Sequence, residues 1–262
     1  MKNDFEQRYR AMVEDNVNVG KTNDGVEFLI LIAGIVALCF LIYLFADNIS
    51  NFFIDRMSID AQLKIEKTIS FATKPTTTNK DKAELEKLEN IRDKIVSHDR
   101  NLQNKSEFKI QEVPQKEINA FVIPDGSIFV TAGLLDKIKD EEILTFVIAH
   151  ELGHYAHRDH LKMISRQIIV ASLMSVISTG NKQVASGTIN SISSLNELKH
   201  SRTQERNADK YANAMLYRIY GNNNGAIKFF QYLDKEKQSP EFMQYFSTHP
   251  STKQRLKLIQ EQ

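Results

Sequence analysis

The pattern His-Glu-Leu-Gly-His places His150, Glu151 and His154 where they can act together on one metal ion. In a helix, residues four apart lie on one face about one turn from each other, so both imidazoles can reach the same ion. Zn²⁺ accepts histidine nitrogen in tetrahedral geometry and lowers the pKa of bound water towards neutrality. Glu151 can then take a proton from that water as it attacks a carbonyl. The pattern predicts one zinc ion per chain.

A short pattern of this kind also arises by chance from ordinary core or surface histidines, so a third ligand is needed. The local candidate is His160, ten residues after His150, as in the pattern HExxHxxGxxH. That pattern has glycine at the turn, and here His157 stands there, which is a poor substitute where a glycine conformation is required. We therefore interpret His157 and His160 as polar residues near the end of the helix, where positive charge is favoured.

The remote candidate for the third ligand is Glu205, in the segment SRTQERNAD from Ser201 to Asp209. If this segment is helical, Glu205 and Asp209 share a face because they are four residues apart. One carboxylate can ligate zinc, and the other can accept the outer N–H of a ligand histidine. Taken alone, the segment fits a solvated helix with scattered charges more readily.

The segment INAFVIPDGSIFVTAGLL, residues 118–135, must position the zinc motif from the N-terminal side. Two short apolar runs flank Pro124-Asp125-Gly126, a turn sequence in which proline fixes one dihedral angle and glycine permits a positive one. This predicts a β-hairpin. One helix is expected to begin near Gly133 and a second near Asp140, whose carboxylate can cap the free N–H groups at its start. The second helix runs into the zinc motif.

Most of the remaining chain is predicted to be helical, with a break at KPTTTN, residues 74–79, where proline and threonines disfavour helix. The fold class is therefore mainly α with a small β-hairpin or sheet, an α+β domain. The expected helices cover residues 55–72, 81–103, 159–178, 189–219, 223–234 and 251–260.

Residues 28–46, FLILIAGIVALCFLIYLFA, carry no charge and are long enough to cross a hydrocarbon layer of about 30 Å. A buried core helix of this length normally has a polar face, and a signal peptide has a shorter apolar run. We therefore predict an uncleaved, single-pass anchor that contacts the lipid bilayer. The expected location is the cell membrane. Basic residues before and after the span nearly balance, but those of the N-terminal tail favour a tail in the cytoplasm and a soluble domain outside it.

The composition excludes several classes of protein. A formal net charge of +1 offers no basic face for nucleic acid. The single cysteine, Cys39, excludes an internal disulfide framework and any cysteine-rich zinc module. Nothing in the composition indicates an oligomeric state.

Three motifs together, HELGH, SRTQERNAD and STHPSTKQRL (residues 247–256), resemble those of the HtpX-like and CAAX prenyl protease-type family of membrane-associated zinc peptidases. The similarity covers roughly residues 118–256, with the motifs in the family's order. The resemblance implies a gluzincin-type peptidase domain behind one transmembrane helix. It implies His150, His154 and Glu205 as zinc ligands and Glu151 as the base. It also implies that Asp209 is a hydrogen-bond partner of a ligand histidine.

The resemblance also implies roles around the substrate. It suggests that His249 and Arg255 approach the substrate carbonyl or its oxyanion, where a donor stabilises developing negative charge. In zinc peptidases of this type an edge strand pairs with an extended substrate. Asn119, Ala120 and Phe121 are the expected substrate-binding residues, although a purely structural strand is an equal alternative.

The sequence departs from the family between the two ligand motifs. Many relatives carry a pair of spans there, whereas residues 168–178, IIVASLMSVIS, are too short to cross a membrane. A CAAX substrate is therefore not expected. The predicted organisation is an N-terminal tail (1–27), a transmembrane helix (28–46), a helical linker region (47–112) and a zinc metallopeptidase domain (113–262).

The sequence therefore predicts a membrane-anchored zinc endopeptidase that cleaves proteins or peptides in quality control or processing. Two alternatives stay open. One is a non-peptidase zinc hydrolase with the same ligands, which an edge strand beside the metal argues against. The other is a membrane-tethered binding or chaperone-like protein with a structural zinc site, which an acid beside a ligand argues against.

Overall fold

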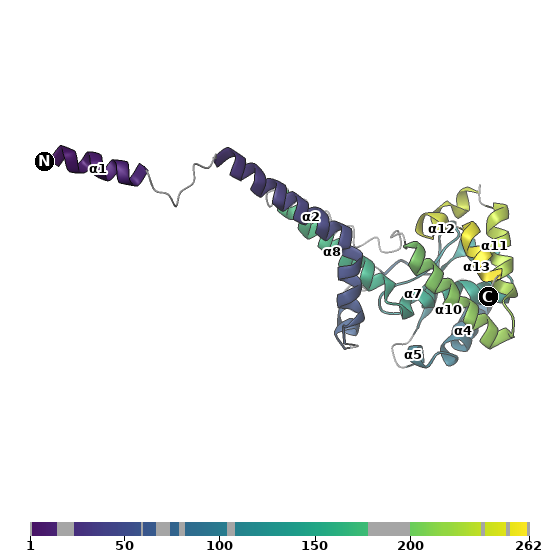
Figure 1. Cartoon of the computed structure of the whole chain (residues 1–262). Helices are drawn as coiled ribbons and strands as arrows, with labels where there is room; N and C mark the ends of the chain where they lie inside the picture. Colours follow the sequence, from purple (N-terminus) through teal and green to yellow (C-terminus); the bar gives the residue numbers. More distant parts are fainter. Residues whose placement is uncertain are drawn as a thin grey trace. The chain divides into compact units, whose positions relative to one another are not determined.

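The computed structural model describes residues 2–14, 24–58, 60–66, 74–78, 82–103, 108–177, 200–236, 239–249 and 252–260. The chain divides into two compact units, Met1–Phe45 and Ala46–Gln262 (Figure 1). The first unit contains α1 (Lys2–Glu14) and most of α2 (Asp24–Asp55), whose last turns belong to the second unit. Part of the helix predicted at 189–219 lies outside the described residues.

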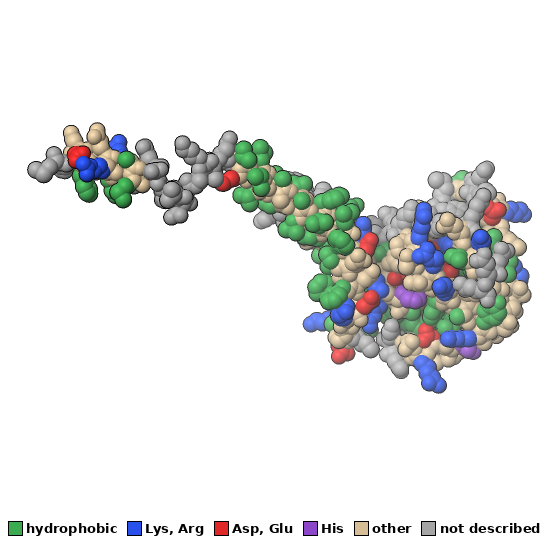
Figure 2. All heavy atoms as spheres, in the orientation of Figure 1, with side chains coloured by type: hydrophobic (Ala, Val, Ile, Leu, Met, Phe, Trp, Pro, Cys, Tyr) green, Lys and Arg blue, Asp and Glu red, His purple; other side chains and the backbone are tan. Residues whose placement is uncertain are grey.

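Helix α2 contains the predicted span. Its stretch Gly25–Asp55 reaches a mean hydropathy of 3.0 and is long and apolar enough to cross a membrane. Apolar side chains of the first unit are exposed around the helix, as the green surface in Figure 2 shows. A helix in a protein core would bury these side chains, so the exposure favours a lipid environment.

The second unit contains a three-stranded sheet in the order β1-β3-β2. Strand β1 (Ile110–Val113) is parallel to β3 (Ile128–Thr131), and β2 (Ala120–Val122) is antiparallel to β3 with Ala120 opposite Val130. The β2–β3 pair is the predicted hairpin, and Gly126 in its turn has a positive φ of 85°. Strand β1 was not predicted. Strand β2 lies at the edge of the sheet.

Helix α7 (Glu141–Ala156) is the central helix of the core and carries the zinc motif. Every residue from Leu144 to Tyr155 is buried, which is typical of a helix packed on all sides. Helices α4 (Lys82–Ser97), α10 (Arg202–Tyr220) and α11 (Asn224–Glu236) pack against it, as does β2. The mainly α fold with a small sheet is therefore confirmed.

The other elements are shorter or lie outside this core. The helix predicted at 55–72 is interrupted, because α2 ends at Asp55, residues 56–58 are not helical, and a separate helical stretch covers residues 60–66. The remaining helices are α5 (Arg100–Gln103), α6 (Ala132–Lys137), α8 (Asp159–Ile177), the 3₁₀ helix η2 (Pro240–Phe242), α12 (Met243–Thr248) and α13 (Thr252–Gln260).

The two ends of α7 are fixed by local interactions. At the start, the Asp140 carboxylate accepts hydrogen bonds from the N–H groups of Glu142 and Ile143, as the sequence predicted. At the end, Arg158 has a φ of 59° and reverses the chain into α8. Its guanidinium donates to the carbonyl of Ile54 at 2.8 Å, satisfying a group at the end of α2. The zinc motif is thus anchored at both ends.

We expect Asp140→Ala to lower the free energy of unfolding by about 1 kcal/mol, because two N–H groups lose their cap. Chemical unfolding of the full chain in detergent, followed by circular dichroism, measures this. Asp140→Asn is the matched control, since asparagine caps equally well but loses the ion pair with Lys228. Equal losses in both variants would assign the effect to the ion pair instead.

Candidate metal centre

Helices α7 and α10 approach each other closely at Gly153. A Cβ atom at this position would lie 3.1 Å from the Cα of Ala208, closer than ordinary van der Waals contact. Glycine therefore lets the backbones of the two helices come together. As a result, the acidic residues of α10 face the histidines of α7 across a narrow gap.

The donor atoms of the three predicted ligands converge in this gap. His150 Nε2 lies 3.1 Å from His154 Nε2, and the two carboxylate oxygens of Glu205 lie 3.4 and 3.6 Å from these nitrogens. Tetrahedral zinc with bonds of about 2.05 Å requires donor atoms roughly 3.3 Å apart. The observed spacing fits zinc, and all three side chains are buried.

His249 lies at a fourth corner of the same cluster. Its Nδ1 is 3.0 Å from Glu205 Oε1 and 3.4 Å from His150 Nε2, so four donors lie within 4.8 Å of one another. Its Nε2 is 3.6 Å from Glu151 Oε1. The resemblance implied a contact with the substrate carbonyl, and the structure places the ring between the ligands and Glu151.

Two carboxylates hold the outer nitrogens of the ligand histidines. Asp209, which was expected to bond to a ligand histidine, lies 3.0 Å from His150 Nδ1. Asp159 accepts from His154 Nδ1 at 2.8 Å. Such partners fix the ring orientation and raise ligand basicity. Sequence reasoning missed Asp159, although an acid directly after the end of the motif helix was the available signal.

Arg255 lies behind the ligand carboxylates. Its Nε and one terminal nitrogen each lie 2.7 Å from an oxygen of Asp209, and the other terminal nitrogen is 2.6 Å from Glu205 Oε2. Burial alone would raise the pKa values of Asp209 and Glu205, but the guanidinium charge helps hold both below their usual range. The family resemblance suggested that Arg255 approaches the substrate oxyanion, whereas here it contacts the acids Glu205 and Asp209 on α10.

Glu151 lies beside the cluster and is not one of the converging donors. Its side chain is buried, and burial raises its pKa, while the neighbouring charges of His249 and His154 act in the opposite direction. A carboxylate whose pKa lies above the usual range is a better proton acceptor. Glu151 is therefore placed to exchange protons in the cleft.

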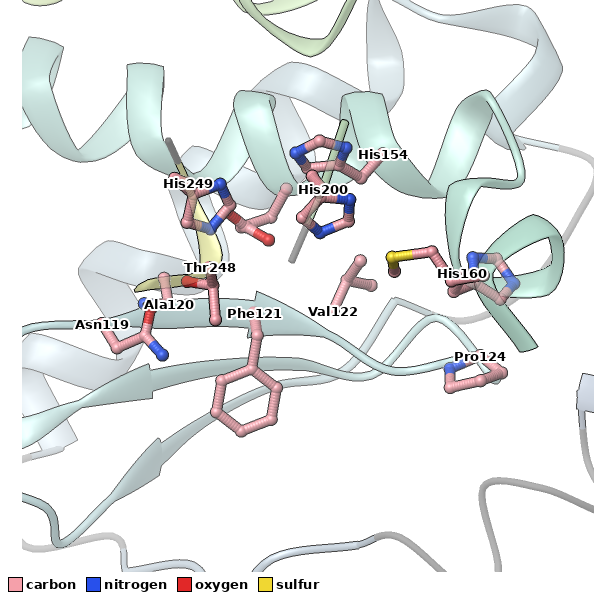
Figure 3. Close-up of a pocket in the computed structure, with 12 residues that line it drawn as sticks. Asn119, Ala120, Phe121, Val122, Pro124, His154, His160, His200, Thr248 and His249 are labelled. Atoms are coloured by element: carbon pink, nitrogen blue, oxygen red, sulfur yellow. Dashed lines mark hydrogen bonds and ion pairs between the residues drawn. The ribbon is translucent and has the colours of Figure 1, made fainter. Parts of the chain in front are cut away.

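A narrow cleft of about 30 Å³ runs between the metal centre and β2 (Figure 3). The predicted substrate residues Asn119, Ala120 and Phe121 line it, opposite Glu151 and His249. The Phe121 ring points away and stacks on Phe129. The complete lining is Asn119, Ala120, Phe121, Val122, Pro124, Glu151, His154, His160, Met163, His200, Thr248 and His249.

Two other histidines, His160 and His200, line the cleft but are not among the four converging donors. His160, the rejected third ligand, lies with its Nε2 3.1 Å from Glu66 Oε1 and not among the converging donors. His200 was not singled out by the sequence. Its ring stacks on His154 with centroids 3.7 Å apart. Its position directly before the SRTQERNAD helix was the only signal in the sequence.

We expect Asp159→Ala to weaken zinc affinity about 10- to 100-fold, because His154 loses the acceptor that orients it. Competition with a chromogenic chelator measures the affinity. Asp136→Ala, which removes an exposed acid, is the control and should bind zinc like the unchanged chain. Unaltered affinity in Asp159→Ala would show that His154 is oriented by packing alone.

Comparison with known proteins agrees with the geometry of this site. Residues 82–262 match the model of peptidase family M48. The mitochondrial metalloendopeptidase OMA1 of Schizosaccharomyces pombe is 30% identical over 55% of this chain and 43% of its own length. OMA1 of Arabidopsis thaliana is 31% identical over 58% of this chain and 31% of its own length.

A bacterial relative gives the same result. Metalloprotease LoiP of Escherichia coli is 28% identical over 56% of this chain and 59% of its own length. The chain thus spans less than two thirds of each of these relatives. The family match nevertheless covers more than half of the chain and includes every proposed zinc donor. The chain therefore belongs to peptidase family M48.

Proposed function

We propose that this chain is a membrane-anchored zinc endopeptidase that hydrolyses peptide bonds in proteins. The observation that carries the proposal is the convergence of His150, His154 and Glu205 at zinc-compatible spacing beside Glu151. A glutamate as third ligand makes the site gluzincin-type. Zinc bound there would supply Lewis acidity, polarising the scissile carbonyl and making water more acidic.

The protein side chains divide the remaining chemistry. Glu151 takes a proton from the attacking water and returns it to the leaving amine. His249, whose Nε2 faces Glu151, donates to the developing oxyanion of the substrate. Arg255 keeps Glu205 and Asp209 ionised and in place, so its action on the oxyanion is indirect.

Strand β2 offers an edge for an extended substrate. The hydrogen bonds Thr131 N–H to Asn119 O and Ile123 N–H to Ser127 O identify the pairs that bond to β3. Because these pairs alternate in antiparallel sheets, the backbone groups of Ala120 and Val122 point away from β3. We propose that the Ala120 carbonyl and both backbone groups of Val122 pair with the substrate backbone, since the Ala120 N–H already donates to Asn119 Oδ1.

Helix α2 is the proposed anchor, with residues 28–46 in the bilayer and the peptidase domain outside the cytoplasm. The exposed apolar surface of this helix supports the first point, and the basic residues of the N-terminal tail support the second. An anchored peptidase reaches proteins in or near the membrane. We therefore propose a role in the quality control or processing of such proteins.

The domain boundaries also stay a proposal. The predicted order is tail, span, helical linker region and peptidase domain from residue 113. The family match begins earlier, at residue 82, and Leu88, Ile91 and Ile95 of α4 share the core with α7. These observations favour counting α4 as part of the peptidase domain.

One observation favours a second candidate function, a binding or chaperone-like protein with a structural zinc site. Structural zinc sites use four protein ligands, whereas catalytic sites keep one position for water. His249 stands at the fourth corner here and would close the site if it stayed there. Measuring whether the zinc-loaded chain cleaves a protein substrate distinguishes the two functions.

The first test compares the unchanged chain with Glu151→Gln, both in detergent with zinc, on casein. We expect cleavage by the unchanged chain and a loss of at least about 1,000-fold in Glu151→Gln, because the general base is gone. Zinc content, measured by atomic absorption, should be equal in both. Equal zinc with no cleavage by either chain would support the structural-site alternative.

A second test addresses the edge strand. Val122→Pro removes an N–H that points away from β3, so the sheet stays paired while one substrate hydrogen bond is lost. We expect kcat/KM to fall about tenfold with zinc content unchanged. Val122→Ala keeps the N–H and is the matched control. A similar loss in both variants would indicate that the side chain, and not the backbone, is used.

A further inference from the structure

His200 occupies a position that the proposed reaction does not use. Its ring stacks on the zinc ligand His154 at 3.7 Å with an interplanar angle of 15°, and it lies 5.4 Å from the ring of His249. Figure 3 shows it between His154 and the strand that carries Val122. This is the space through which a substrate paired with β2 would pass.

The cleft is too small for a substrate in this arrangement. A volume of about 30 Å³ accommodates one or two water molecules, whereas ligand pockets in proteins usually measure about 300–1,000 Å³. A peptide cannot lie between β2 and the metal centre unless a side chain moves. His200 fills the space directly in front of His154 and is therefore the first candidate.

A second cavity lies on the other side of His200. We call it the outer cavity; its volume is about 710 Å³. His200 and Met163 line both the cleft and the outer cavity, so their side chains form the wall between the two. The outer cavity is also lined by Ser50 and Asn51 of α2, Lys162 and Arg166 of α8, and Gln204 and Asn207 of α10.

The interactions that hold His200 allow its side chain to turn. Its backbone N–H donates to the carbonyl of Thr248 at 3.1 Å, which fixes the main chain. Its buried Nδ1 has no hydrogen-bond partner among the described residues. The contacts of the ring are stacking on His154 and His249. Turning it aside would join the cleft to the outer cavity while the backbone stays in place.

We propose that His200 is a gate residue, and that an extended polypeptide displaces its ring in order to reach the metal centre and continue into the outer cavity. This inference rests on the proposed peptidase function. The gate keeps the centre closed to small groups and opens for a chain long enough to occupy both spaces. His200 thus sets access and does not take part in the chemical step.

Binding of fluorescently labelled casein to the full chain tests the gate. Four zinc-loaded forms in detergent are compared by fluorescence anisotropy, all carrying Glu151→Gln so that nothing is cleaved: the parent, His200→Ala, His200→Phe and His98→Ala. His200→Ala removes the gate, and His200→Phe keeps an aromatic ring in it. His98 is exposed and does not line the cleft, so His98→Ala is the control.

We expect His200→Ala to bind casein about two- to tenfold more tightly than the parent, the range that one stacked aromatic pair is worth. His200→Phe should bind no more tightly than the parent, and His98→Ala should be unchanged. Without Glu151→Gln, His200→Ala should cleave dilute casein faster by a similar factor.

Three results would overturn the gate. His200→Ala could bind casein no more tightly than its parent while the unchanged chain cleaves casein, which refutes the gate alone. His200→Ala could lose zinc, which would make His200 part of the metal site. All forms could hold zinc but neither bind nor cleave casein, which refutes the gate and the proposed peptidase function together.

Discussion

The arrangement of the metal centre depends on one buried network of charges, in which the guanidinium of Arg255 contacts Glu205 and Asp209. Burying two carboxylates is costly unless they are paired and hydrogen-bonded. Arg255 on α13 supplies both, which links the C-terminal helix to α10. Through Asp209, the network also reaches His150 on α7. Three helices from distant parts of the sequence are therefore held in one geometry before any metal binds.

The close contact at Gly153 also holds α7 and α10 in one fixed geometry. Because α7 and α10 touch through backbone atoms, the histidines and the acids face each other at short range. Helix α7 is also the central core helix, so its position is fixed by packing on all sides. Structural rigidity and ligand geometry are thus provided by the same residues. A catalytic site benefits from such preorganisation, because little rearrangement is needed during the reaction.

Access to this rigid centre is controlled by less constrained parts. His200 lies just before α10, and the contacts of its ring are stacking on His154 and His249. His249 lies at the end of α12 and is held by Glu205. Both rings are close to the metal donors, but only the His200 ring is proposed to move aside for substrate. Ligand-binding segments are commonly drawn from the less stable parts of a fold. In the proposed gate, the metal centre is fixed and the His200 ring in front of it moves, so that a long polypeptide gains access and small groups do not.

The sequence by itself determined the features that depend on local spacing. The His150–His154 pair, the Asp140 cap, the turn at Gly126 and the apolar run at 28–46 follow from residue types a few positions apart. The mainly α class and the hairpin followed for the same reason. The family resemblance extended this to Glu205 and Asp209, which lie about fifty residues downstream.

Only the tertiary structure decided which distant residues meet. Strand β1 and the contacts of Arg255 have no local pattern that predicts them, and both depend on packing across long sequence separations. Asp159 and His200 stand beside the motif helices, but only the folded chain assigns their contacts with His154. Local spacing therefore indicated the chemistry of the site, and tertiary packing decided its orientation, its support and its access.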